Sequence, residues 1–262
     1  MDEDALNDVS FLSGSPNRVR ALAELGGAPH ERSDIEETLG ISRVTAKRIL
    51  DDFEARGWAT REGRTYRTTL LGDAIAAEFR GLLETVSTMR TLSTVLPWLP
   101  EGFDVDLRRL SDVRITLPDP SDSVAPVRRS SELMHEAEEV RGLAVGIAPD
   151  TLRVNRDRVV GGEQSFEVMF STDVIDVVRS DSRMTGWLHD ILEAGGRAYV
   201  HDDVGCMLGE FDRRTAALGL RDSTGAPRAV LESEDEAMLE WARRTFEAHR
   251  DEATPLDAET FP

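Results

Sequence analysis

The chain has 262 residues, enough for two domains, and a formal net charge of −19. Its single cysteine, Cys206, excludes an internal disulfide bond. No apolar run approaches the ~20 residues of a membrane span, and the acidic start, Met-Asp-Glu-Asp, lacks the pattern of a signal peptide. We therefore expect a soluble cytoplasmic protein that does not bind membranes.

Lysine is almost absent from the chain. Of 31 basic residues only Lys47 is a lysine, and the other thirty are arginines. Abundant Asp and Glu with almost no lysine is typical of proteins that stay soluble in molar intracellular salt. An ordinary acidic surface would explain the net charge but not the missing lysine, so the composition predicts a halophilic archaeal protein.

Two short helices joined by a tight turn are predicted between residues 33 and 58. Ser33 and Glu36 have the spacing of a capping box at the start of the first helix. Gly40 supplies a left-handed residue that ends this helix, and Ser42 caps the second. This is the arrangement of a helix-turn-helix.

The second helix has two distinct faces. An apolar stripe at spacings of four and three predicts the inner face: Ala46, Leu50 and Phe53. A recognition helix contacts base edges with its N-terminal residues. The candidate DNA-binding residues there are Ser42, Arg43, Val44, Thr45, Lys47 and Arg48.

A short hairpin is predicted directly after this helix. Strands at 58–61 and 64–69 flank a Glu62-Gly63 turn, as in the wing of a winged helix. Arginines on it suit phosphates or the minor groove. The wing candidates for DNA binding are Arg61, Arg64, Tyr66 and Arg67. With an earlier helix opening at Ser15-Pro16, residues 1–70 form a predicted winged helix-turn-helix domain.

A long helix is predicted from Leu70 to about Leu96, within a linker at 71–100. Apolar residues step by three or four along it, close to a heptad repeat. The candidate dimerisation residues are Leu71, Ile75, Leu82, Val86, Met89 and Leu96. The alternative is an amphipathic helix that packs only on its own domains. Pro97 to Gly102 then ends the helix.

Residues 101–255 alternate between apolar strands and helices, which predicts an α/β sheet domain covered on both faces, followed by a tail at 256–262. Strands are expected at 113–117, 143–147, 166–170, 197–200, 206–211, 215–220 and 228–231. Helices are expected at 132–140, at 171–178 after a Ser171 cap, at 184–194, and from a Ser233 cap to about His249, with a loop at 118–126.

No catalytic motif is found in this half. Residues 71–262 contain no lysine, which excludes a Walker lysine, a Schiff-base lysine and the His-x-Lys pair of phospholipase-D-like hydrolases. Gly-x-Ser-x-Gly and Gly-x-Gly-x-x-Gly are absent too. We therefore predict no enzyme, no cofactor and no metal.

Four residues remain weak ligand candidates: His135, His201, Asp202 and Cys206. The cluster from His201 to Cys206 suits a metal or redox site, or is a solvated turn followed by a buried thiol. His135 lies on a helix surface or lines a pocket. Arg128-Arg129 binds an anion or is merely solvated.

Several stretches resemble a known family. Leu39-Gly-Ile-Ser-Arg-Val-Thr, Arg56-Gly-Trp and the closing segment 230–250 are similar to archaeal regulators related to the methanogenesis and filamentation (Fil-type) regulator. The Trp-Ala-Arg-Arg-Thr-Phe stretch within that segment resembles sugar-responsive TrmB-type regulators. The resemblance implies a transcription factor with a sensor-like domain, and it carries no ligand residues over.

Together these features predict an α+β chain with an N-terminal winged helix-turn-helix, a long linker helix and a C-terminal α/β sensor-like domain. The predicted function is sequence-specific binding of double-stranded operator DNA, as a homodimer, with a small-molecule effector. The alternative is an α/β metabolite-binding or enzymatic module whose winged helix mediates protein contacts. Clustered arginines on the recognition helix and wing favour DNA.

Overall fold

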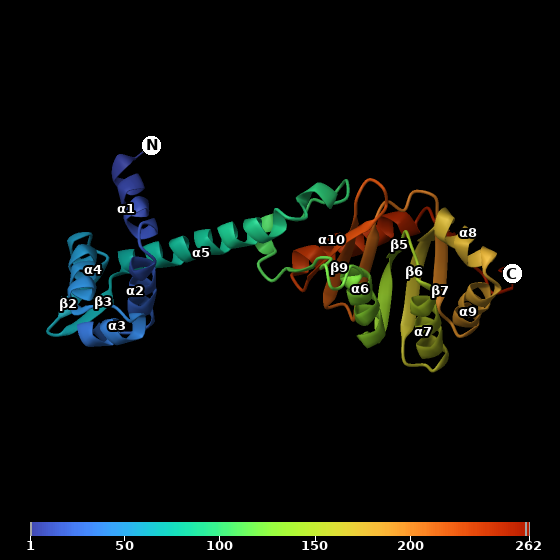
Figure 1. Cartoon of the computed structure of the whole chain (residues 1–262), viewed down its shortest axis with the longest axis horizontal. Helices are drawn as coiled ribbons and strands as arrows, with labels where there is room; N and C mark the ends of the chain where they lie inside the picture. The colour runs from blue at the N-terminus through green and yellow to red at the C-terminus, as the bar shows by residue number, and fades with distance from the viewer. Residues whose placement is uncertain (1, 260, 262) are drawn as a thin grey trace. The chain divides into compact units, whose positions relative to one another are not determined.

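The computed structural model describes residues 2–259 and 261, which divide into two units, Met1–Val86 and Ser87–Pro262. The boundary between the units falls inside helix α5, Leu70–Leu92 (Figure 1). The predicted α+β class is confirmed, because a helical unit with a small antiparallel sheet precedes this helix and a large mixed sheet follows it.

The first unit is a winged helix-turn-helix. Its small sheet has the strand order β1-β3-β2, and β2 and β3 form the predicted wing. Its elements before α5 are α1 Glu3–Ser13, α2 Pro16–Gly27, β1 His30–Glu31, α3 Arg32–Leu39, α4 Arg43–Ala55, β2 Ala59–Glu62 and β3 Thr65–Thr68. The sequence pattern had indicated neither α1 nor the two-residue strand β1.

Local capping explains where the two central helices end and begin. Gly40 ends α3 with a φ of 61°, and the Ser42 Oγ accepts a hydrogen bond from the Thr45 N–H at the start of α4. The expected capping box at Ser33 and Glu36 is wrong. Helix α3 begins at Arg32, and Asp34 accepts a hydrogen bond from the Glu31 N–H at 2.8 Å, so Ser33 lies within the helix.

An aromatic cluster lies at the centre of the first unit. Phe11, Phe53 and Trp58 meet with ring centroids about 6 Å apart, from α1, α4 and the start of the wing. Gly72 on α5 packs directly against this region, since a Cβ there would lie 1.9 Å from the Trp58 carbonyl oxygen. The absence of a side chain at Gly72 therefore allows α5 to lie on the wing.

Helix α5 ends at Leu92, four residues earlier than predicted. The chain turns at 93–95 and then forms a short 3-10 helix over Leu96–Trp98, with Pro97 in its first turn, where the missing N–H of proline is tolerated. No helix among the described residues has the length and apolar character needed to cross a membrane.

The second unit contains an eight-stranded mixed sheet with the order β11-β7-β6-β5-β8-β9-β10-β4. Strands β5, β6 and β7 are parallel, and the other pairings are antiparallel. The strands are β4 Arg114–Thr116, β5 Glu139–Ala144, β6 Ser165–Ser171, β7 Arg197–His201, β8 Met207–Phe211, β9 Thr215–Arg221, β10 Pro227–Ser233 and β11 Thr254–Pro255. The helices are α6 Ala125–Glu136, α7 Pro149–Val160, α8 Thr172–Ser180, α9 Ser182–Glu193 and α10 Glu236–Arg250.

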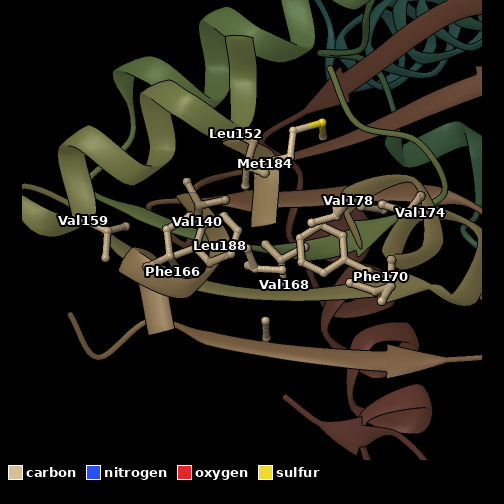
Figure 2. Close-up of a cluster of buried hydrophobic side chains, with 14 of the residues drawn as sticks. Val140, Leu152, Val159, Phe166, Val168, Phe170, Val174, Val178, Met184 and Leu188 are labelled. Carbon is tan, nitrogen blue, oxygen red and sulfur yellow. The ribbon is translucent and has the colours of Figure 1, made fainter. Parts of the chain in front are cut away.

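Side chains on both faces of this sheet are buried, as the apolar strands predicted. On one face, Val140 and Phe166 from the strands pack against α7 and α9 (Figure 2). On the other face, Leu143 and Met169 belong to a second cluster with Trp241 of α10. Adjacent strand residues thus point to opposite cores. Phe261, within the predicted tail, is buried in the first of these cores.

Several boundaries in the second unit differ from the prediction. Helix α6 begins at Ala125, with Pro126 in its first turn, and strand β5 begins at Glu139, where parallel pairing with β6 starts. Helix α7 was not predicted at all. Asp235, not Ser233, caps the last helix; Ser233 ends β10 and its hydroxyl donates to Asp112 at 2.7 Å.

Candidate nucleic-acid interface and an apolar cavity

Helix α4 buries one face and exposes the other. Its buried residues are Ala46, Ile49, Leu50 and Phe53. On the outer face Arg43, Lys47 and Arg48 are exposed, and the Val44 side chain is 78% exposed. Thr45 is half-buried, and its hydroxyl lies 3.0 Å from the Ser42 hydroxyl. The first two turns therefore present basic and small side chains to solvent.

The cations of this face differ in their partners. Lys47 forms an ion pair with Asp51, one turn further along the helix. In the described part of the chain, neither Arg43 nor Arg48 has a hydrogen-bond or ion-pair partner. Two guanidinium groups next to a helix N-terminus are thus free to bind an anionic ligand.

The wing carries three exposed arginines around the Gly63 turn, where φ is 65°. Arg61 donates to the Gly63 carbonyl oxygen at 2.8 Å. Arg64 lies 3.5 Å from Glu31, and Arg67 lies 2.5 Å from Glu62. Exposed pairs of this kind contribute ~0–1 kcal/mol each, so a phosphate can replace the carboxylate at little cost.

Tyr66 does not belong with these residues. Tyr66 is 4% exposed and lies in the core of the first unit. The guanidinium carbon of Arg61 lies over its ring, 5.4 Å from the ring centroid. The expectation that Tyr66 contacts DNA is corrected, because β3 points it inward between outward-facing neighbours.

Arg56, at the C-terminal end of α4, has a structural role. Its Nε lies 3.1 Å from an Asp8 carboxylate oxygen, and its guanidinium stacks on the Phe11 ring at 3.7 Å. This arginine ties α1 to the end of α4.

The candidate dimerisation residues fall into two groups. Leu71, Leu82, Val86 and Leu96 are between 43% and 53% exposed. Ile75 packs against the core of the first unit, and Met89 packs against the core of the second. Part of the heptad-like repeat therefore reflects packing within each unit, as the alternative interpretation expected.

The four weak ligand candidates do not form one site. His135 is exposed on α6. His201 Nδ1 accepts from the Asp203 N–H, and Asp202 accepts from the Thr172 hydroxyl. Burial raises the pKa of the Cys206 thiol to about 11. In the described residues no group of three His, Cys, Asp or Glu side chains is placed to hold a metal ion.

Arg129 is not a solvated cation. Its guanidinium forms an ion pair with the buried carboxylate of Glu232 at 2.8 Å, and this pair joins α6 to β10. Arg128 lies 2.5 Å from Asp122. The buried partner makes Arg129 unavailable to an anion, whereas the pair of Arg128 is exposed.

A cavity of about 340 Å³ lies between helices α6 and α7 and strands β5, β6, β8, β9 and β10. Most of its lining is apolar, and it includes Val140, Phe166 and Phe170. Two polar side chains that the sequence patterns had not indicated, Asn155 and Arg221, also line it. The one local signal was Pro149, which follows a strand and is followed by Leu152, Asn155 and Val159 at helical spacing.

Comparison with known proteins gives two domain matches. The family model described as the HVO_A0261 N-terminal domain matches residues 6–91. The model of the middle domain of the methanogenesis regulatory protein FilR1 matches residues 124–252. No curated protein matches the sequence.

The solved structures that match the chain share little sequence with it, and their TM-scores are below 0.5. TrmBL2, an archaeal chromatin protein, is 12% identical, with a TM-score of 0.44 over 95% of this chain and 98% of its own. Nuc, a phospholipase D family member from Salmonella typhimurium, is 10% identical, with a TM-score of 0.44 over 55% of this chain and 99% of its own. NucT from Helicobacter pylori is 9% identical, with a TM-score of 0.42 over 55% of this chain and 98% of its own.

The two domain matches follow one another in the same order as the winged helix and the mixed sheet, and they confirm the family resemblance drawn from the sequence motifs. This is the architecture of a DNA-binding transcriptional regulator. The chain thus carries an HVO_A0261 N-terminal domain at residues 6–91 and a FilR1 middle domain at residues 124–252.

Proposed function

We propose that the chain is a sequence-specific regulator that binds double-stranded DNA as a homodimer in molar salt, and that its second unit senses an effector. One observation carries the DNA-reading part of this proposal. Arg43 and Arg48 extend from the first turns of a capped, exposed recognition helix, and no carboxylate among the described residues neutralises them. Bidentate arginine contacts to guanine are the commonest specific readout in the major groove.

The wing supplies the second set of contacts. Arg61, Arg64 and Arg67 surround a tight turn at the end of a two-stranded hairpin. Their partners within the chain are weak and exposed, so these side chains are suited to phosphates beside the groove that α4 reads. Molar salt reduces the affinity gained from counterion release. Base contacts and dimer geometry then provide more of the binding free energy than in a low-salt regulator.

Dimerisation is supported by an exposed apolar ridge on α5. Leu71, Leu82, Leu83 and Val86 are between 46% and 53% exposed. Three of them fall within five residues, on a helix that continues well beyond the winged helix core. A second copy of the same ridge is a matched apolar partner. Two recognition helices paired in this way would read half-sites about 10 base pairs apart or a multiple of that spacing.

The proposal is tested by footprinting the full chain on its own upstream region in about 2 M KCl, where charges are screened within ~3 Å. We expect a protected, roughly palindromic site. The Arg43→Ala/Arg48→Ala variant should lose it, since each bidentate base contact is worth ~1–3 kcal/mol. A matched control removes two arginines of the second unit, Arg183 and Arg213, each 73% exposed, and should leave the footprint unchanged.

Dimerisation is measured on the same samples by sedimentation velocity. Leu82→Glu/Val86→Glu should sediment as a monomer and lose the palindromic footprint. A monomeric parent chain would refute the dimer. Equal footprints from the parent and from the Arg43→Ala/Arg48→Ala variant would refute the proposed reading helix.

A further inference from the structure

The cavity of the second unit lies on the sheet face that carries α6 and α7, and its floor is formed by the central strands. Its volume of about 340 Å³ is at the lower end of the ~300–1,000 Å³ found for small-molecule sites. A cavity of ~150 Å³ accommodates benzene. The cavity therefore suits a ligand of roughly a dozen non-hydrogen atoms, most of them apolar.

Asn155 is the first polar group of this cavity. It lies on α7, is 3% exposed and lines the cavity. Within the described residues its Oδ1 has no hydrogen-bond partner, and its Nδ2 meets only the Met134 sulfur at 3.7 Å. Buried side-chain amides are nearly always hydrogen-bonded. An amide in this state, in the lining of an apolar cavity, is suited to a ligand group that completes its hydrogen bonds.

Arg221, at the end of β9, is the second polar group. Burial lowers the pKa of its guanidinium, and no described carboxylate pairs with it. It is held against Gly146, where a Cβ would lie 2.3 Å from its Nη2. Its hydrogen bond from Nη1 to the Gly225 carbonyl oxygen is long at 3.4 Å. Nearby, Arg228 is fully engaged with Asp222 at 2.5 Å and does not line the cavity.

The other polar residues of the lining already have partners: the hydroxyls of Ser130, Ser131 and Thr151 form hydrogen bonds, and Arg141 forms ion pairs with Glu167 and Glu247. One partly desolvated cation and one unsatisfied amide therefore remain to select a ligand. We propose that this cavity binds a monocarboxylate with an apolar body of about ten carbons, which places its carboxylate on Arg221 and a hydroxyl, when present, on Asn155. The apolar body covers the sheet between α6 and α7. A single arginine suits a single negative charge, and a hydroxyl suits the amide in either orientation because it both donates and accepts. This inference rests on the effector-sensing part of the proposed function and specifies its ligand.

Binding is tested on the full chain without DNA, by isothermal titration in 0.5 M and 2 M KCl. The probes are decanoate, decanol, decyl phosphate and 10-hydroxydecanoate. We expect decanoate to bind more tightly than decanol or the more highly charged decyl phosphate. Arg221→Gln should weaken decanoate binding by about tenfold or more, because a charge-assisted hydrogen bond is lost, and should leave decanol unchanged. The control Arg228→Gln should stay within about twofold of the parent chain.

Two further variants distinguish the contribution of the cavity to binding from that of Arg221. Ile147→Trp places a larger side chain in the lining and should abolish binding of every probe, with circular dichroism and the melting temperature checking that the variant folds. Asn155→Leu should remove any preference for 10-hydroxydecanoate over decanoate. Equal affinities for decanoate and decanol, or equal losses in Arg221→Gln and Arg228→Gln, would overturn the carboxylate assignment. Tighter binding of decyl phosphate would assign the site to phosphate esters instead.

The outcome for this site is separable from that for DNA binding. A footprint without binding of any probe would overturn the carboxylate site and leave the DNA-reading proposal intact. Probe binding that does not alter the affinity for the protected DNA would support the site and refute effector sensing through it.

Discussion

Replacing Gly72 by alanine tests how α5 joins the winged helix. A Cβ at this position would lie 1.9 Å from the Trp58 carbonyl oxygen, about 1.5 Å short of the 3.4 Å of ordinary contact. The obstacle is backbone, so no flexible side chain can move aside. The same oxygen accepts a hydrogen bond from the Thr69 N–H at 2.9 Å, which links the wing to α5.

The expected cost combines three effects. Overpacking costs ~1–3 kcal/mol, and a lost backbone hydrogen bond costs ~1 kcal/mol. The higher helix propensity of alanine stabilises the helix by ~1 kcal/mol and offsets part of this cost. We therefore expect Gly72→Ala to lower the free energy of unfolding of the first unit by about 2 kcal/mol. Gly81→Ala on the same helix meets open space and should instead raise it by about 0.5–1 kcal/mol.

The assay is native-state hydrogen exchange in molar KCl, followed on peptides from α4 and the wing. It reports the opening of the first unit separately from the second. Gly72→Ala should accelerate exchange in those peptides, and Gly81→Ala should slow it. If the two variants exchanged at the same rate, the close approach of α5 to Trp58 would not exist in solution.

Two further predictions concern the second unit. Arg129→Met leaves the Glu232 carboxylate buried without its cation, so the free energy of unfolding measured in urea should fall by about 3 kcal/mol. The double variant Arg129→Met/Glu232→Leu should recover most of this stability. If it were as unstable as the single variant, the buried charge would not be the cause. Burial raises the pKa of Cys206 to about 11, so the thiol stays protonated at pH 8. Iodoacetamide should label it far more slowly in the native chain than in urea, with the rate rising as pH approaches 11. Equal rates in the two states would show an accessible, reactive thiol.

The winged helix was predictable because its signals are local. The Ser42 cap, the Gly40 terminator and the Gly63 turn each act within a few residues, and the structure bears them out. Besides the missed α1 and β1, two predictions about single residues were wrong here. Glu31 and Asp34 began α3 ahead of Ser33, and an alternating strand turned Tyr66 inward.

The second unit was predictable in class but not in register. Apolar runs located most strands, whereas β5 was placed four residues late because its position is set by pairing with distant strands. Position 142, for example, needs a glycine because β8 passes close to it: a Cβ there would lie 2.2 Å from the Leu208 carbonyl oxygen. Arg129 and Glu232 are likewise 103 residues apart in the chain. The cavity combines residues of α6, α7 and five strands, so no single segment of sequence could indicate it.

The isolation of Lys47 on α4 has a chemical consequence. Because it is the chain's only lysine, a reagent that acylates side-chain amines has one target, and that target is 63% exposed on the outer face of the recognition helix. Acetylation would remove one positive charge and also release Asp51 from its ion pair. The modified helix would then present an unpaired carboxylate to the phosphates. With Arg43, Lys47, Arg48 and Asp51 counted, one acyl group thus lowers the net charge of this face from +2 to +1.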